Sequence, residues 1–239
     1  MNVFVVSAHP EPKSFCIAMR DAGIAKLREA GHEVVLSDLY QMKFNPVASG
    51  DDFLARSNED YLVYALEQRH AHKNNALAPD IKSELDKLLA CDLLILNFPV
   101  YWFSVPAIMK GWFDRVFISG PTYGGRRFYD RGGLKGKRAL IAATLGSRDY
   151  MFGRQGVHGH AEAMFRHLLW GTLGYVGLDV LPPFFAWHVP YVSKEERELI
   201  NQSYVKHLDK LDSLKPLAMP SLSNFDERMA PKLVHAIDQ

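Results

Sequence analysis

Short apolar runs alternate with longer amphipathic stretches along this chain. Continuous apolar runs over 3–6, 93–96 and 139–143 are typical of strands that are covered on both faces, and 33–36 and 178–185 add two more candidates. Between these runs, apolar residues recur at helical spacing over 15–27, 81–89, 106–117, 161–173 and 194–211. Strands that alternate with helices predict an α/β fold with a doubly wound, five-stranded parallel sheet and helices on both faces.

Two segments depart from this regular alternation. The connection over 38–69 is long for a compact domain and carries helical signals over 61–67, so we expect a binding loop there. From residue 213 onward the chain has two prolines and little periodicity. We therefore expect a domain over 1–212 and a tail over 213–239 that packs as an extended segment on the domain or on a partner subunit.

Composition excludes several classes of function. Lys plus Arg number 28 against 27 Asp plus Glu, and no long single-sign block is present, which disfavours nucleic acid as a partner. The longest uncharged stretch, 93–109, is interrupted by Asn97 and Pro99, so we expect no stable membrane insertion. Cys16 and Cys91 are the only cysteines and suit free core thiols in a reducing compartment. With no signal peptide at the N-terminus, these features favour a cytoplasmic location.

The loop after the first predicted strand leads directly into a helix. Ser14 is a suitable N-cap, and the free N–H groups of a helix N-terminus favour an anion such as phosphate. Neither GxxxxGK[ST] nor GxGxxG is present, which disfavours ATP hydrolysis and Rossmann-type NAD binding. His9 and Ser14 are candidate side-chain donors to a pyrophosphate, although Ser14 as a cap alone explains its position as well.

The loop after the third predicted strand is aromatic. Tyr101, Trp102 and Phe103 are consecutive and cannot all point into one core, which favours contact with a flat ligand such as an isoalloxazine ring. A packing cluster at the sheet edge is the alternative.

The loop after the fourth predicted strand combines small residues with a titratable group. Residues 144–148 offer backbone N–H groups that can hydrogen-bond the pyrimidine edge of a flavin. His158 follows and is the candidate proton donor, unless it is structural. The pairs His70 and His72, and His158 and His160, lack cysteine or carboxylate companions at ligand spacing, so we expect no metal site.

One long motif resembles a known family. The NAD(P)H:quinone oxidoreductases of the DT-diaphorase type have a similar signature, which this chain carries as Phe98-Pro99-x-x-Trp102-Phe103-x-Val105-Pro106-Ala107-Ile108-x-Lys110-Gly111-Trp112-Phe113-x-Arg115-Val116-Phe117. Shorter matches extend the resemblance over roughly residues 1–210, among them Ser37-Asp38-Leu39-Tyr40 and Gln155-Gly156-Val157-His158-Gly159.

The resemblance implies a flavodoxin-like homodimer that binds FAD, with FMN less expected. It further implies a ping-pong cycle in which NADH or NADPH gives hydride to flavin N5, and a quinone receives two electrons; azo or nitroaromatic acceptors suit the same scaffold. The positions that match the family's cofactor-binding residues are His9, Ser14, Phe15, Cys16, Tyr64, Pro99, Val100, Tyr101, Trp102, Phe103, Thr144, Leu145, Gly146, Ser147 and Arg197.

The family's aromatic substrate platform is shared across the dimer and is matched by Tyr123, Phe128 and Tyr175. A tyrosine that works with the catalytic histidine is replaced by Phe152, so either His158 acts alone or Tyr150 takes over the lost role. A flavin-containing regulatory subunit of a potassium-efflux system stays open as another function. A one-electron carrier is disfavoured, because the loop after the first predicted strand lacks a phosphate-binding stretch rich in Thr, Ser and Gly. The choice between NADH and NADPH and the physiological acceptor stay open as well.

Overall fold

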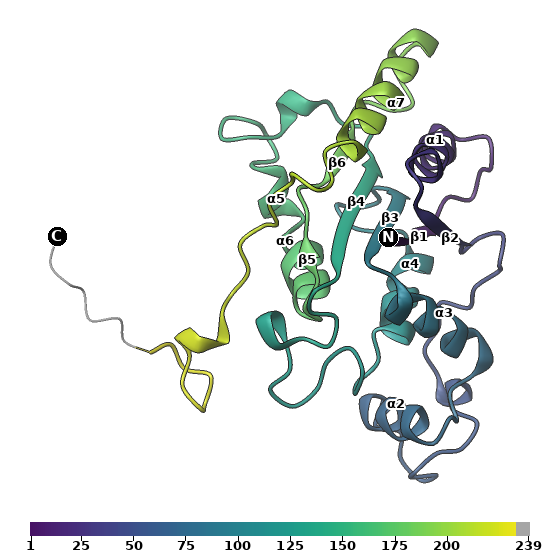
Figure 1. Ribbon diagram of the computed structural model, residues 1–239, viewed down its shortest axis with the longest axis vertical. Helices are drawn as coiled ribbons and strands as arrows, with labels where there is room; N and C mark the ends of the chain where they lie inside the picture. The colour runs from purple at the N-terminus through teal and green to yellow at the C-terminus, as the bar shows by residue number, and fades with distance from the viewer. Residues whose placement is uncertain (233–239) are drawn as a thin grey trace, which may run out of the picture.

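The computed structural model describes residues 1–232 of the chain. Its centre is a parallel sheet in the order β2-β1-β3-β4-β5, with a further short strand, β6, that also pairs with β4 (Figure 1). The strands are β1 (Asn2–Ser7), β2 (Glu33–Asp38), β3 (Leu93–Pro99), β4 (Arg138–Thr144), β5 (Asp179–Val180) and β6 (Phe184–Ala186). The doubly wound parallel sheet is thus confirmed.

The predicted fifth strand over 178–185 occurs as two pieces. Both β5 and β6 pair with β4, and Pro182 and Pro183 separate them. Proline has no N–H to donate to a sheet ladder, so pairing stops at these residues and resumes after them.

The helices are α1 (Phe15–Glu29), α2 (Tyr64–Lys73), α3 (Pro79–Ala90), α4 (Ala107–Val116), α5 (Ala161–Met164), α6 (Arg166–Leu168), the π-helix η4 (Leu169–Gly174) and α7 (Lys194–Leu208). Of these, α1, α3, α4 and α7 begin and end close to the predicted bounds, whereas α2 extends beyond the predicted 61–67 to Lys73. Short 3₁₀ turns lie at Gly50–Asp52 (η1), Tyr129–Arg131 (η2), Asp149–Met151 (η3) and Leu222–Asn224 (η5). None of the helices within 1–232 combines the length and apolarity needed to cross a membrane.

The predicted single helix over 161–173 is divided into α5, α6 and η4. Phe165 ends α5 with φ −93° and ψ 11°, and its ring is buried against Phe185. The last piece, η4, is a wider helix than an α-helix. The N–H of Tyr175 donates to the carbonyl of Trp170, five residues earlier, instead of to the residue four earlier. Gly171 and Gly174 lie in this stretch, and glycine is a weak helix former.

Alternate positions of each central strand face opposite sides of the sheet. Val3, Val5 and Leu93 pack with α1 and α7, whereas Phe4, Val6 and Leu94 pack with α3 and α4. This two-residue period explains why the strands are continuously apolar, since both of their faces are covered.

A buried ion pair holds the long connection after β2 against the domain. The Arg115 guanidinium on α4 donates to Asp52 Oδ1 at 2.7 Å and to Asp80 Oδ2 at 2.6 Å, and the side chains of Arg115 and Asp52 are only 3% and 2% exposed. The hydroxyl of Tyr64 donates to Asp52 as well. A Cβ at Gly111 on α4 would collide with the backbone of Pro46, so this close approach requires glycine.

After α7, the tail passes beside β5 at the edge of the sheet. The N–H of Leu217 donates to the carbonyl of Val180 in β5, and the Ser221 hydroxyl donates to Asp130. Figure 1 shows this yellow segment running away from α7 to η5. The remainder of the predicted tail, 233–239, lies outside the described residues.

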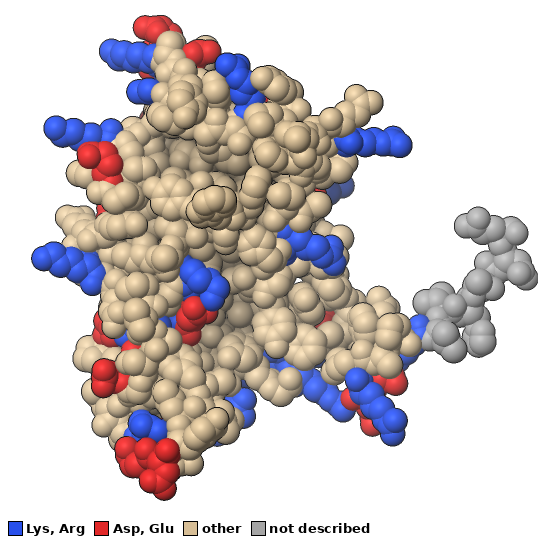
Figure 2. Space-filling view, turned by 180° about the vertical axis from the view of Figure 1, so that it is seen from behind, with Lys and Arg blue, Asp and Glu red and all other residues tan. Residues whose placement is uncertain are grey.

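On the face turned away in Figure 1, acidic and basic side chains of the described residues are interspersed (Figure 2).

Candidate functional site

A cavity of about 470 Å³ opens where β1, β3 and β4 end. Parallel strands that end together leave a crevice in which ligands of open α/β sheets bind. The N–H of Val100 donates to the carbonyl of Thr144 at 2.9 Å and thereby joins two of its walls. The lining consists of His9, Lys13, Ser14, Phe15, Cys16, Pro99, Val100, Tyr101, Thr144, Gly146, Val189, Pro190 and Arg197. Ten of these residues are among the predicted cofactor-binding positions.

The N-terminus of α1 forms one side of the cavity. The Ser14 side chain accepts a hydrogen bond from the N–H of Ile17 at 3.3 Å, so Ser14 caps the helix and its own hydroxyl hydrogen is free for another acceptor. The first N–H groups of a helix have no partner inside it, which leaves those of Phe15 and Cys16 for an anion. Both interpretations of Ser14, helix cap and donor, are therefore compatible.

His9 lies beside this helix terminus and lines the same cavity. Burial lowers its pKa, opposed by the backbone hydrogen bond and the charge of Glu11. Its Nδ1 lies 3.0 Å from the backbone nitrogen and 3.1 Å from the carbonyl oxygen of Glu11. Nδ1 is thus engaged by the Glu11 backbone, and Nε2 is the ring nitrogen left to face a ligand.

Arg197 completes the polar side of the cavity from α7. Its Nη2 donates to the carbonyl of Pro190 at 3.1 Å. Its Nε is buried and has no hydrogen-bond partner among the described residues. A buried charged donor without a partner is costly, and an anion in this cavity would reduce that cost.

Cys16 contributes its backbone rather than a reactive thiol. Its side chain is 2% exposed, and its Sγ lies 3.5 Å from Asn97 Oδ1 in a buried network that also holds Ser7. Burial raises the pKa of Cys16 to about 12. A thiol in this state is a packing group and not a nucleophile.

Five predicted cofactor residues do not line the cavity. Leu145 is buried, and the carbonyl of Ser147 accepts a hydrogen bond from the N–H of His188. Tyr64 belongs to the Asp52 and Arg115 cluster instead, where burial and the Asp52 hydrogen bond raise its pKa. Trp102 is 97% exposed, and Phe103 packs near His158. Their assignment to the cofactor stays a prediction.

Trp102 and Phe103 have an unusual backbone. Their φ angles are +51° and +55°, in the left-handed region that bulky residues seldom adopt. This turn presents the indole to solvent while the Phe103 ring points toward the loop after β4. Residues held in such backbone conformations cluster at ligand-binding sites, which makes this turn a candidate binding element.

The predicted catalytic residues fall into two groups. His158, Phe152 and Phe103 are neighbours, with ring centroids 5.1 Å apart for His158 and Phe152 and 5.1 Å apart for Phe103 and His158. Trp187 lies on Phe152 at 5.0 Å and is a site neighbour that the sequence did not single out. Tyr150 is 70% exposed, outside this aromatic group.

The predicted substrate residues form a second aromatic group. Phe128 stacks on Tyr175 with centroids 5.4 Å apart and planes 6° apart, and Tyr123 lies 5.9 Å from Tyr175. Tyr123 and Phe128 lie on the loop that leads into β4, and Tyr175 lies on the turn that leads into β5. The N–H of Leu134, four residues before β4, donates to the carbonyl of Val176 and joins the two segments. This group therefore lies at the amino end of β4, whereas the cavity lies at its carboxyl end.

Three cavity residues were not predicted. Lys13 precedes a helix N-terminus, so its positive charge next to a predicted anion site was a usable signal. Val189 and Pro190 follow β6 in a segment without motif or periodicity, and only the folded chain brings them to the cavity.

No group of three or more His, Cys, Asp or Glu side chains suited to a metal ion occurs within 1–232.

Comparison with known proteins identifies the family. Residues 1–211 match the family described as having a flavodoxin-like fold. The chain is 40% identical over 221 residues to ribosyldihydronicotinamide dehydrogenase [quinone] of Mus musculus, covering 90% of this chain and 94% of that protein. It is 37% identical over 226 residues to NAD(P)H dehydrogenase [quinone] 1 of Rattus norvegicus, covering 94% and 82%.

A solved structure agrees with these relatives. A putative quinone reductase from Klebsiella pneumoniae superposes with a TM-score of 0.90 at 30% identity, covering 97% of this chain and 94% of that one. The fold and the cavity define a flavodoxin-like protein. The chain belongs to the NAD(P)H:quinone oxidoreductase family, and the resemblance of its long motif is thereby confirmed.

Proposed function

We propose that this chain is an FAD-dependent NAD(P)H:quinone oxidoreductase that works by a two-electron ping-pong cycle. The relatives named as quinone dehydrogenases cover nearly the whole chain and support the activity class. The single observation that supports the cofactor is the cavity at the ends of β1, β3 and β4, where polar donors surround a space bounded by Pro99 and Val100.

The donors of the cavity fit a diphosphate better than a single phosphate. One cationic side is formed by the α1 N-terminus and Lys13, and the other by Arg197 at the start of α7. The Arg197 Nε, which has no hydrogen-bond partner within residues 1–232, supports an anion on that second side. Two separate sides suit the pyrophosphate of FAD, and this supports FAD over FMN.

A bound flavin would accept hydride from the nicotinamide and pass it to the quinone. His158 would hold a proton close to the negative charge that develops near N1 and O2 of the flavin when it accepts hydride, a role that a preorganised donor serves in other enzymes. Phe152 packs on the imidazole and supports its position, although it offers no hydroxyl. Tyr150 would reach the same place only by leaving its exposed position.

We propose further that the active form is a homodimer. The aromatic group of Phe128, Tyr123 and Tyr175 lies at the opposite end of β4 from the cavity, so one chain does not bring acceptor platform and cofactor cavity together. A second copy can place its platform over the first copy's cavity, with the exposed Trp102 between them.

Two buried free thiols support a reducing, cytoplasmic location.

Steady-state kinetics test this function. Purified protein is supplied with FAD, NADPH and a benzoquinone, and initial rates are measured while both substrates are varied. Parallel double-reciprocal lines support the ping-pong cycle, and sizing at the assay concentration should give a dimer. Absence of quinone reduction with either NADH or NADPH would contradict the proposed activity.

A further inference from the structure

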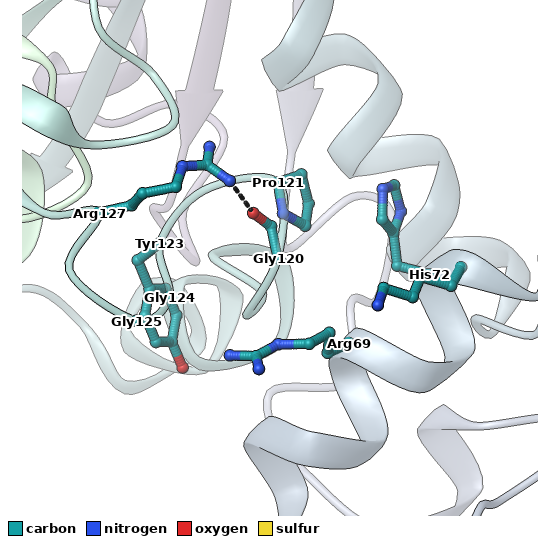
Figure 3. A pocket seen from close by; sticks show the side chains of 9 residues that line it. Arg69, His72, Gly120, Pro121, Tyr123, Gly124, Gly125 and Arg127 are labelled. Atoms are coloured by element: carbon teal, nitrogen blue, oxygen red, sulfur yellow. Dashed lines mark hydrogen bonds between the residues drawn. The ribbon is translucent and has the colours of Figure 1, made fainter.

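A second cavity, of about 480 Å³, lies between α2 and the loop that follows α4. Arg69, His72 and Lys73 line it from α2, and Tyr123 and Arg127 line it from the loop, together with three glycines (Figure 3). We call it the basic pocket. Its lining contains two arginines and a lysine but no acidic residue.

The two guanidinium groups are held in place by single hydrogen bonds. Arg69 Nη2 donates to the Ser119 hydroxyl at 2.9 Å, and Arg127 Nη1 donates to the carbonyl of Gly120 at 3.0 Å. Neither arginine, nor Lys73, forms a salt bridge within residues 1–232. Each guanidinium has five N–H donors, so most of them stay available to a ligand.

The glycine-rich loop makes room for this arrangement. Gly120, Gly124 and Gly125 have φ angles of +113°, +145° and +61°, which side-chain-bearing residues rarely adopt. A Cβ on Gly124 would lie 3.0 Å from Arg69 Nη2. Glycine at this position therefore lets the loop pass close to the guanidinium and keeps the pocket open.

Position and charge together indicate the ligand. Two arginines and a lysine in a lining without acidic residues suit the dianion of a phosphate monoester, whose oxygens planar guanidinium groups can bind in pairs. Tyr123 is shared between this pocket and the aromatic group, since its ring lies 5.9 Å from that of Tyr175. In Figure 3 the Tyr123 hydroxyl lies beside the Arg69 guanidinium.

We propose that the basic pocket binds the 2′-phosphate of NADPH and gives the enzyme a preference for NADPH over NADH. This inference rests on the proposed function, because it places the phosphate of the hydride donor next to the proposed acceptor platform. Arg69 and Arg127 hold the phosphate from two sides, and Lys73 adds a third charge.

Kinetics with two donors test the preference. NADH lacks the 2′-phosphate and is otherwise the same donor, so it is the matched control substrate. The variants are Arg69→Gln, Arg127→Gln and the double variant, and the control variant is Lys82→Gln, which removes one exposed charge on α3. We expect KM for NADPH to rise about tenfold in each single variant while KM for NADH stays within about twofold. Equal changes for both donors, or no change for either, would overturn the proposal.

Calorimetry tests binding without turnover. We expect adenosine 2′-monophosphate to bind the holoenzyme, adenosine to bind far more weakly, and the double variant to lose the difference. Inorganic phosphate that competes as well as adenosine 2′-monophosphate would assign the pocket to a free anion and overturn the nucleotide assignment. If the wild-type protein oxidises neither donor, the proposed function fails, while the calorimetry still decides what the pocket binds.

Discussion

The imidazole of His158 packs against the ring of Phe152, with centroids 5.1 Å apart and planes at 48°. This pair leaves His158 as the polar member of the aromatic group at the end of β4, since Phe152 has no hydroxyl. Removing one preorganised donor to a developing charge costs roughly 10²-fold to 10³-fold in rate in a comparable case. We therefore expect His158→Ala to slow flavin reduction by about 10²-fold.

Two further variants separate the possible donors. Phe152→Tyr should speed reduction or leave it unchanged, because it adds a hydroxyl next to His158. Tyr150→Phe should have little effect, because Tyr150 is 70% exposed and outside the group. Stopped-flow reduction of the bound flavin by NADPH measures all three. A large effect of Tyr150→Phe together with none of His158→Ala would move the proton donor to Tyr150.

Arg115→Met should destabilise the fold strongly. It leaves the buried Asp52 carboxylate without its partner at 2.7 Å, and breaking such a pair costs about 3–5 kcal/mol of unfolding free energy. The control Lys82→Met breaks an exposed pair with Asp86 and should cost at most about 0.5 kcal/mol. Urea denaturation measures both, and equal losses for the two variants would show that burial does not set the energy of the Arg115 pair.

Both cysteines should resist thiol reagents in the native state. Burial raises the pKa of Cys16 to about 12 and that of Cys91 to about 11, so very little thiolate forms at pH 8. Titration with a chromogenic disulfide at pH 8 should detect no fast-reacting thiol in the folded protein and two after denaturation. One fast native thiol that disappears in Cys16→Ser would contradict the buried position of Cys16.

The fold should lose stability as pH falls below about 6.5, where a histidine in an unfolded chain takes up its proton. Burial lowers the pKa of His207, helped by the charge of Lys210 and opposed by a backbone hydrogen bond, so the folded protein binds this proton less readily than the unfolded chain does. The stabilisation is present above the unfolded pKa and is lost as pH falls toward the folded one. His207→Gln should flatten the decline between pH 7 and 5, as measured by chemical denaturation. If the slope of unfolding free energy against pH is unchanged in His207→Gln, the decline comes from other groups, His9 among them.

Local patterns were sufficient to predict most of the fold. Val3 to Val6 and Leu93 to Leu96 are apolar on both faces because helices cover both sides of the sheet. Two predicted elements are interrupted in the structure. Pro182 and Pro183 divide the last predicted strand, and Phe165 ends α5 before the predicted end of the helix.

The site was predicted where motif and sheet geometry coincide. His9 follows β1, and Pro99 and Thr144 are the last residues of β3 and β4. These strands end together, so the meeting of the three residues follows from the parallel sheet. Pairs formed across long sequence separations were beyond prediction. Asp52 and Arg115 are 63 residues apart, and Arg69 and Ser119 are 50 apart, so no local pattern links them.

Identification of the cofactor carried by the purified protein tests the central claim most directly. The protein is expressed with riboflavin supplied, freed of small molecules, and examined by absorption spectroscopy and by mass spectrometry of the material released on denaturation. The account predicts the visible absorption bands of a protein-bound flavin and a released mass equal to that of FAD. A protein with no flavin that also fails to bind added FAD would contradict it.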